Sequence, residues 1–213
     1  MPGGESMESI IDIWTSNPTE KGTTYVVPDG CRDVIVTEID GMQQVHVSSL
    51  FEATIDVDIT PNAKMTGYRL APGTWVDESQ LMAATGKDID DLFDKINAFS
   101  RRCSNVDEAL FSLGERLGSV ADISRSLGVS ERTLQRHLLK HSGKSPQFWL
   151  QLARARQSAR AIAEGAPLID TAFDFGYADQ AHLSREIKRW FGVTPSELLL
   201  RKDLTVQLYV PGY

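Results

Sequence analysis

Cysteine is scarce in this sequence: its 213 residues include only two, Cys31 and Cys103. The two lie too far apart for a Cys-x-x-Cys redox pair, and the four scattered histidines do not complete a metal-binding set with them. The sequence also lacks a basic start followed by an apolar run, and no stretch reaches the roughly 18 apolar residues that span a membrane. These absences predict a cytoplasmic protein with reduced thiols, no metal and no cofactor.

Basic residues are few in the first half of the chain. Residues 1–99 contain 17 acidic and 6 basic side chains, a net charge of −11, whereas residues 100–213 carry a net charge of +4. The content of 41% hydrophobic and 24% charged residues is ordinary for a globular protein. The uneven charge predicts two bodies with different partners, and a basic C-terminal body suits a polyanion such as nucleic acid.

Residues 1–86 show the pattern of β-strands. The stretch "TYVVPDGCRDVIVTEIDGMQQVHVSS" alternates apolar and polar residues in short runs, with expected hairpin turns at Pro28-Asp29-Gly30 and at Asp40-Gly41. Further strands are expected in "EATIDVDIT" and in "MTGYRLAPG". The sequence therefore predicts a small antiparallel sheet or barrel.

From Asp88 onward the spacing of apolar residues changes to three and four, which is typical of amphipathic helices. The residues with this spacing are Ile89, Leu92, Phe93, Ile96, Val106, Leu110, Leu113 and Leu117. We expect residues 87–117 to form a helical connector. The expected fold class is α+β, with a β-rich N-terminal domain over residues 1–86 and an all-α C-terminal domain.

Residues 118–202 nearly repeat themselves. The segment "ISRSLGVSERTLQRHLLKHSGKSP" aligns with "TAFDFGYADQAHLSREIKRWFGVTP", with matched leucine, arginine, glycine and proline positions about 49 residues apart. Each copy has a short helix, a glycine that can end it, a turn, and a second helix behind the capping residue Ser130 or Asp179. This is the anatomy of two helix-turn-helix units, followed by a tail over residues 203–213.

The second helix of each unit carries the candidate chemistry. Its apolar stripe is expected to face inward, so that polar side chains of its first half face outward. Arg and Gln match guanine and adenine edges in the major groove, and a helix fits into that groove. The outward residues are Arg132, Gln135 and Arg136 in the first copy and Gln180, His182, Ser184 and Arg185 in the second.

A long helix is expected between the copies, in "SPQFWLQLARARQSARAIAEG", with Pro146 near its start and Gly165 at its end. About 20 residues give a helix of roughly 30 Å. Successive major-groove segments on one face of B-DNA lie about 34 Å apart. One chain could therefore place both recognition helices on one face of the duplex.

Residues 118–201 resemble the DNA-binding domain of the AraC/XylS family of bacterial transcription regulators. The resemblance is carried by "LGVSERTLQRHLLKHSGKSPQFW", "GYADQAHLSREIKRWFGVTPSEL" and the helix between them with Arg154. It implies base contacts from the outward residues named above. Phosphate contacts are expected from Ser130, Thr133, Lys144, Lys188 and Arg189. The resemblance leaves open RNA polymerase, a small-molecule effector and a second copy of the chain as further partners.

The N-terminal part resembles, more weakly, a β domain that precedes this DNA-binding module in a subset of such regulators, through "VVPDGCRDVIV" and "TGYRLAPGT". No activity follows from that resemblance. Tyr25, His46, Tyr68 and Trp75 are candidate pocket residues, although core or surface positions suit them equally. His137, His141 and His182 belong to the DNA-binding half.

Two other functions stay open from the sequence. Cys31, beside Arg32, could act as a thiolate, as in DNA repair proteins that pair a similar module with an alkyl-accepting cysteine. The sequence argues against this function because Asp29 and Asp33 would raise the pKa of the Cys31 thiol. Alternatively, the chain could bind DNA only within a protein complex, with the acidic N-terminal domain as its docking surface. The expected function is a sequence-specific regulator without enzymatic activity.

Overall fold

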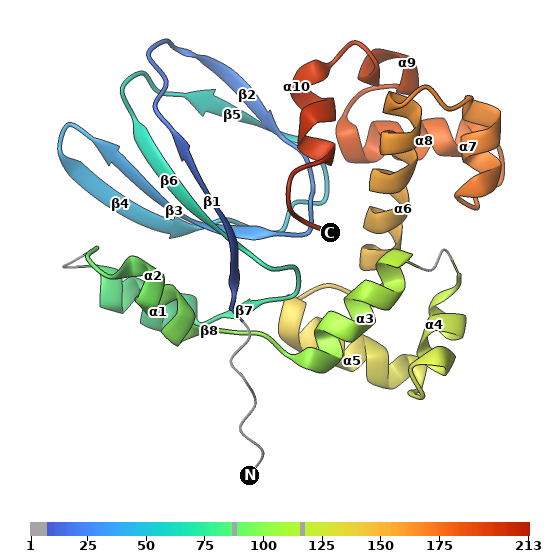
Figure 1. The fold of residues 1–213 in the computed structure, drawn as a ribbon, viewed down its shortest axis with the longest axis horizontal. Helices are drawn as coiled ribbons and strands as arrows, with labels where there is room; N and C mark the ends of the chain where they lie inside the picture. Colours follow the sequence, from blue (N-terminus) through green and yellow to red (C-terminus); the bar gives the residue numbers. More distant parts are fainter. Residues whose placement is uncertain (1–7, 87–88, 116–117) are drawn as a thin grey trace.

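The computed structural model describes residues 8–86, 89–115 and 118–213. A β-rich half lies beside a helical half, and the C-terminus lies between them (Figure 1). The α+β class expected from the sequence is confirmed.

Two antiparallel sheets form the β-rich half. The larger has the order β1 (Ile10–Ser16), β6 (Lys64–Leu70), β3 (Arg32–Ile39), β4 (Met42–Val47), and the smaller pairs β2 (Gly22–Val26) with β5 (Ile55–Ile59). The hairpin turn predicted at Asp40-Gly41 is confirmed: both residues have positive φ, and Ile39 pairs with Met42. Strand β1 was not expected from the sequence.

The hairpin turn predicted at Pro28-Asp29-Gly30 is wrong. Strands β2 and β3 on either side of it belong to different sheets, so residues 27–31 form a crossover between the sheets. Val27 and Cys31, at the two ends of this crossover, are 2% and 3% exposed. Turn chemistry alone could not distinguish a tight hairpin from a buried crossover, because both accept Pro, Asp and Gly.

Two helices cover one face of the larger sheet. These are α1 (Glu78–Thr85) and α2 (Leu92–Phe99), flanked by the short strands β7 (Trp75–Val76) and β8 (Ser100–Arg101). Helix α1 begins where the Asp77 side chain accepts from the backbone N–H of Gln80, and the sequence had not indicated it. Val34 and Leu70 of the sheet pack with Leu81 and Ile96 of the helices.

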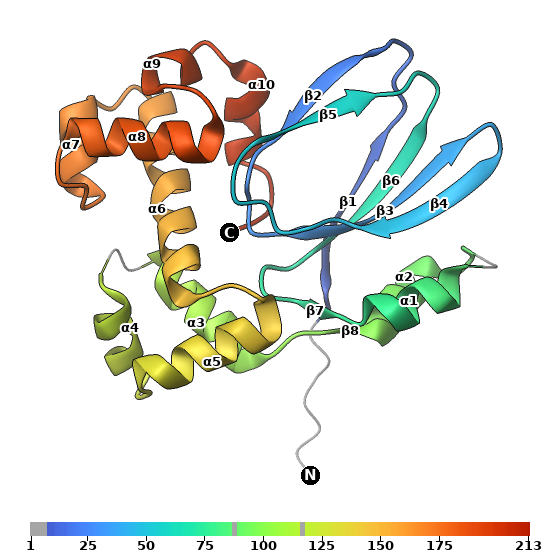
Figure 2. The same cartoon turned by 180° about the vertical axis from the view of Figure 1, so that it is seen from behind.

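Short helices around a long central one form the other half (Figure 2). They are α3 (Ser104–Glu115), α4 (Val120–Ser126), α5 (Glu131–Ser142), α6 (Pro146–Ala163), α7 (Leu168–Asp174), α8 (Gln180–Phe191), α9 (Pro195–Leu198), α10 (Lys202–Thr205) and the 3-10 helix η1 (Val206–Leu208). Residues 87–117 were expected as a connector. The described part, residues 89–115, contributes a helix to each half: α2 packs on the sheet and α3 packs on α6, whereas Leu117 lies outside the described residues.

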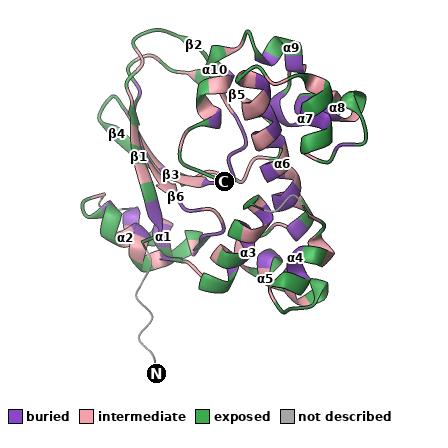
Figure 3. Cartoon of the chain, turned by 45° about the vertical axis from the view of Figure 1, so that its right-hand side comes forward, coloured by how far each residue is buried: buried purple, intermediate pink, exposed green. Residues whose placement is uncertain are grey.

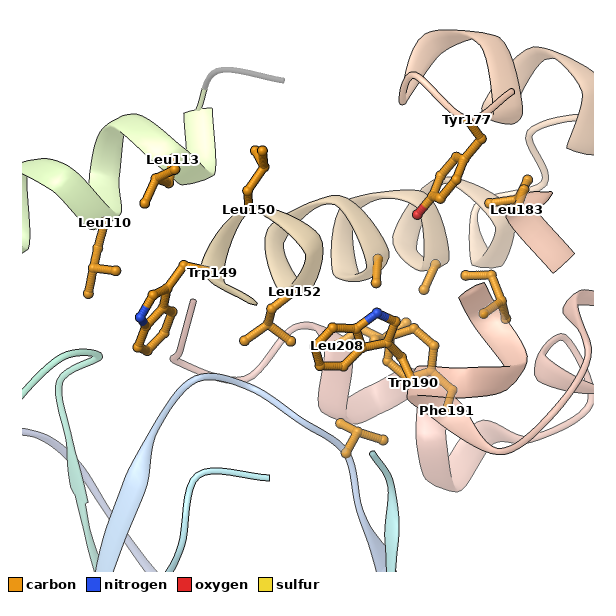
Figure 4. Packing of buried hydrophobic residues seen from close by; sticks show 14 of the residues in the cluster. Leu110, Leu113, Trp149, Leu150, Leu152, Tyr177, Leu183, Trp190, Phe191 and Leu208 are labelled. Atoms are coloured by element: carbon orange, nitrogen blue, oxygen red, sulfur yellow. The ribbon is translucent and has the colours of Figure 1, made fainter. Parts of the chain in front are cut away.

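One apolar core runs along α6 and holds both helix-turn-helix units (Figure 4). Leu134 and Leu138 of α5 and Leu183 and Ile187 of α8 point into this core, as their spacing predicts. Figure 3 shows the buried residues along α6 and the exposed surfaces of the outer helices. The core therefore fixes which faces of α5 and α8 remain outside.

Candidate nucleic-acid interface

Helices α5 and α8, which the sequence predicts to read DNA, both begin with a side-chain cap. The Ser130 hydroxyl accepts from the backbone N–H of Thr133 at 3.2 Å, and the Asp179 carboxylate accepts from that of His182 at 2.6 Å. Both helices end at a glycine in the left-handed region, Gly143 with φ 69° and Gly192 with φ 74°. The repeat seen in the sequence is therefore a repeat of helix geometry.

The first unit presents long polar side chains on α5. Arg132, Gln135 and Arg136 are all exposed, while Leu134 and Leu138 of the same helix are buried. The three exposed side chains share one face of the helix, because Arg132 lies three residues before Gln135 and four residues before Arg136. This places together the first set of residues predicted to contact bases.

The second unit presents a more constrained surface on α8. Gln180 and Arg185 are exposed, whereas the Ser184 hydroxyl donates to the Gln180 carbonyl at 2.9 Å. His182 Nδ1 accepts from the backbone N–H of Ala178 at 3.3 Å, and its ring packs edge-on against Tyr177. Since Nδ1 is the acceptor, the neutral ring carries its proton on Nε2. The His182 ring is therefore held in one orientation, with its Nε2–H as the hydrogen-bond donor.

The residues predicted to contact phosphate have different surroundings. Lys188 is exposed, and Arg189 pairs with Glu186 at 3.2 Å. Ser130 and Thr133 lie at the N-terminus of α5, where free backbone N–H groups favour an anion. Lys144 instead donates to Glu52 of the β-rich half, an ion pair that the sequence could not indicate.

The central helix α6 connects the two units through polar contacts as well as apolar packing. The indole N–H of Trp149 donates to the Ser142 hydroxyl at the end of α5 at 3.0 Å. At the other unit, the Ser158 and Tyr177 hydroxyls lie 3.2 Å apart, and the Arg154 guanidinium lies 5.8 Å from the centre of the Tyr177 ring. The two units are therefore tied to one rigid element.

Cys31 lacks the setting of a reactive thiol. It is 3% exposed, and burial followed by the nearby Asp29 raises the pKa of the thiol well above its usual value. The sequence had predicted this direction from Asp29 and Asp33. Within residues 8–86, 89–115 and 118–213, no group of three His, Cys, Asp or Glu side chains could hold a metal ion.

The β-rich half contains a cavity of about 670 Å³ between its two sheets. Of the four candidate pocket residues, Tyr25 and His46 line this cavity. Tyr68 instead packs toward α1 and α2, and the Trp75 ring lies under the Arg101 guanidinium. The lining from the larger sheet includes Trp14, Ile35, Met65 and Arg69, and the smaller sheet contributes Thr24, Ile55 and Val57. The sequence did not single these residues out as pocket residues, although Trp14, Ile55 and Val57 alternate with exposed residues along their strands.

Charged groups form one end of the cavity. Arg69 pairs with Asp29 at 3.1 Å and with Asp33 at 3.2 Å, and the Trp14 indole N–H donates to Asp33 at 3.1 Å. Burial raises the pKa of Asp29, and this effect outweighs the opposing influence of Arg69. The cavity thus combines an apolar body with one polar end.

Two helix-turn-helix units on one central helix are typical of DNA-binding proteins. Comparisons with known proteins support this class. Residues 123–201 match the family model described as a helix-turn-helix domain. The transcriptional activator RhaS of Escherichia fergusonii is 35% identical over 88 residues, which are 40% of this chain and 31% of RhaS. The transcriptional regulator VirS of Mycobacterium tuberculosis is 35% identical over 80 residues, 37% of this chain and 23% of VirS.

Over this part of the helical half, the chain is similar to a helix-turn-helix domain and to relatives that are named as transcription regulators. The matched part spans about a third or less of the length of those relatives. Among solved structures, the C-terminal domain of AraT from Geobacillus stearothermophilus is 21% identical with a TM-score of 0.44, over 47% of this chain and 87% of that one. ToxT from Vibrio cholerae is 11% identical with a TM-score of 0.45, over 92% and 97%.

Of the helices that the structure describes, none combines the length and the apolar content that a membrane crossing requires.

Proposed function

We propose that this chain regulates transcription by binding double-stranded DNA through both helix-turn-helix units, with α5 and α8 entering successive major-groove segments on one face. The observation that carries the proposal is the matched outward faces of the two helices at opposite ends of α6. Helix α6 has 18 residues, which corresponds to about 27 Å. That length is of the same order as the groove repeat of about 34 Å.

Within each helix we assign specificity to the first half and anchoring to the second. Arg136 and Arg185 occupy the same position of the repeat, and bidentate contacts of arginine with guanine suit that position. Lys188 and Arg189 lie a turn later, where a helix entering by its N-terminus leaves the groove and meets backbone phosphates.

Binding-site selection from random duplexes tests this assignment. Arg136→Ala and Arg185→Ala should each cost about 1–3 kcal/mol and relax the preference at one base position, the two positions lying about 10 base pairs apart. Arg125→Ala is the matched control, because Arg125 is an exposed arginine of α4 that pairs with Asp122. Equal losses for every sequence in both variants would show that the helices do not read bases.

We also propose that the cavity between the sheets holds a small-molecule effector. Its volume of about 670 Å³ lies within the range of about 300–1,000 Å³ typical of ligand sites, and apolar side chains with a few charged groups line it. A screen of small metabolites by thermal unfolding should find compounds that raise the midpoint. Ile35→Trp, which fills the cavity, should abolish that rise, and a rise that persists in this variant would place the ligand elsewhere.

A further inference from the structure

The crossover between β2 and β3 and the C-terminal segment together join the two halves of the molecule. Residues 27–31 come from the β-rich half, and residues 202–213 follow the second helix-turn-helix unit. Both segments pack on α6, and Val27 and Leu208 are buried in the core that holds the helix-turn-helix units. Figure 4 shows Leu208 among the core residues. We call these two segments the clasp.

Arg156 of α6 is the centre of the clasp. Its side chain is 0% exposed and donates to the Tyr213 carbonyl at 2.7 Å, the Pro28 carbonyl at 3.0 Å and the Leu208 carbonyl at 3.1 Å. Burial lowers the pKa of Arg156 to about 10. A buried guanidinium is stable only while such acceptors surround it, so both segments of the clasp must be seated together.

Gln207 and Tyr213 hold the C-terminal segment against the β-rich half, and Tyr213 also bonds to α3 of the helical half. The Gln207 amide donates to the Tyr25 carbonyl at 2.9 Å and accepts from the backbone N–H of Val27 at 3.2 Å. The Tyr213 backbone N–H donates to the Asp29 carbonyl at 2.7 Å, and its hydroxyl donates to the Leu110 carbonyl at 3.0 Å. Every link joins residues that are far apart in sequence.

The fit at Gly30 is tight. Gly30 has φ 75°, and a Cβ there would lie 2.7 Å from the Cβ of Tyr213 and 2.8 Å from the Trp149 ring. Glycine is therefore required both by the backbone conformation and by the closeness of the two halves.

The same docking occupies groups of the DNA-binding half. Glu52 pairs with Lys144, a cation predicted to contact phosphate, and the Lys144 contact lowers the pKa of the Glu52 carboxyl. Two residues further on, the backbone N–H of Thr54 donates to the Trp190 carbonyl of α8 at 2.8 Å. The acidic half, with its net charge of −11, is thus held against the basic half.

We infer that the clasp is an autoinhibitory device: seated as observed, it holds the acidic half where Glu52 neutralises Lys144, and its release raises the affinity for DNA. This inference rests on the proposed DNA-binding function. The wall of the cavity includes Gln207 and Val210 of the clasp, and Arg69 at its charged end donates to the Pro211 carbonyl at 3.1 Å. A molecule in the cavity therefore touches the segment that controls docking.

Cys31 provides a built-in reporter of the clasp. A Cβ on Gly212 would lie 3.6 Å from the Cys31 sulfur, so the C-terminal segment covers the thiol. N-ethylmaleimide alkylates Cys31 only when the C-terminal segment has moved away from the thiol. The rate of this alkylation therefore measures how often the segment detaches, and peptide mass spectrometry identifies the alkylated cysteine. Cys103, which is partly exposed, serves as the internal reference in the same sample.

The test compares four full-length proteins: wild type, the double variant Gln207→Ala/Tyr213→Ala, Glu52→Gln, and Val206→Ala. Val206 is 61% exposed beside Gln207 and serves as the matched control. The double variant should alkylate Cys31 at least about tenfold faster, since local opening exposes groups in proportion to its equilibrium population. Glu52→Gln should leave the alkylation rate nearly unchanged.

DNA affinity is measured by anisotropy on one labelled random duplex of about 40 base pairs, roughly four helical turns. Both the double variant and Glu52→Gln should bind about five- to tenfold tighter than wild type at 0.1 M salt, with a log–log salt slope steeper by about 1, because one more cation becomes available to phosphate. Val206→Ala should match wild type in both measurements.

Each failure has a distinct form. Wild-type affinity in Glu52→Gln overturns the inference, and so does a double variant that exposes Cys31 without a gain in affinity. If circular dichroism shows that the double variant is unfolded, Glu52→Gln decides alone, because Glu52 is an exposed side chain. Absence of DNA binding by all four proteins at low salt would instead refute the proposed function itself.

Discussion

His141 in α5 and Trp190 in α8 occupy the same position of the repeat, 49 residues apart, yet His141 is partly exposed and Trp190 is 0% exposed. Trp190 packs near Phe148 of α6, and its carbonyl accepts from Thr54 of the β-rich half. His141 lies near the outer end of its helix, beside Lys140. The repeat therefore places Trp190 in the shared core between two neighbours, while its counterpart His141 stays partly exposed.

The same difference appears on the surfaces that are proposed to read DNA. In the first unit Arg132, Gln135 and Arg136 extend into solvent, whereas in the second unit His182 and Ser184 are bonded to their own helix start. Side chains that are already oriented lose less entropy on binding, while free ones adapt to more than one contact. A duplicated fold can thus give one adaptable and one fixed reading surface.

The largest contrast is expected for the stability effects of substitutions at Trp190 and at its counterpart His141. Trp190→Ala should lower the free energy of unfolding by about 3–5 kcal/mol, because it leaves a cavity in the shared core. His141→Ala, at the equivalent position, should change it by no more than about 0.5 kcal/mol. Urea unfolding followed by circular dichroism gives both values, and comparable losses would mean that the first unit is anchored as firmly as the second.

A smaller contrast concerns the caps of the recognition helices. Asp179→Ser keeps a side-chain cap on α8 but removes a negative charge next to the proposed phosphate path, so DNA affinity should rise by about 0.5–1 kcal/mol. Ser130→Asp makes the reverse change on α5 and should weaken binding by a similar amount. Anisotropy titrations at low and high salt check the pair, with thermal midpoints as the control for helix stability. Effects that do not shrink at high salt would contradict the electrostatic explanation.

Local signals account for what the sequence predicted well. The apolar spacing, the caps Ser130 and Asp179 and the repeated glycines act within one helix and its turn, so they could be read without tertiary structure. The clasp could not, because its bonds join residues that are far apart in sequence, such as Pro28 and Arg156, which are 128 positions apart. One signal was present: Arg156 lies four residues after Leu152 and three before Ala159, on the apolar stripe of α6. An arginine on that stripe indicates a buried acceptor set rather than a surface cation.

Helix α1 and the crossover at residues 27–31 were missed for a different physical reason. Helix α1 has only eight residues, and its stability comes from packing Leu81 on the sheet rather than from a strong periodic pattern. The crossover has the composition of a turn, but its path is set by the division of β2 and β3 between two sheets. The base-reading assignments stay predictions that rest on the exposed faces of α5 and α8.

The smallest effect is expected in the pH dependence of stability. It again distinguishes the first helix-turn-helix unit, which contains His141, from the second. Partial burial, followed by the nearby charges of Lys140 and His137, lowers the pKa of His141 below its usual 6.5. A histidine whose pKa is lower in the folded state binds protons more readily when unfolded. The free energy of unfolding should therefore decrease as pH falls below about 6.5, until the folded protein also takes up the proton.

His141→Gln should remove this part of the pH dependence, leaving a flatter stability profile between pH 7.5 and 5.5. Trp190 does not titrate, so the second unit has no counterpart of this effect at the equivalent position. Urea midpoints measured at half-unit pH steps for wild type and His141→Gln provide the test, with His46→Gln as a control in the β-rich half. Parallel profiles for wild type and His141→Gln would mean that the folded and unfolded states bind the His141 proton equally well.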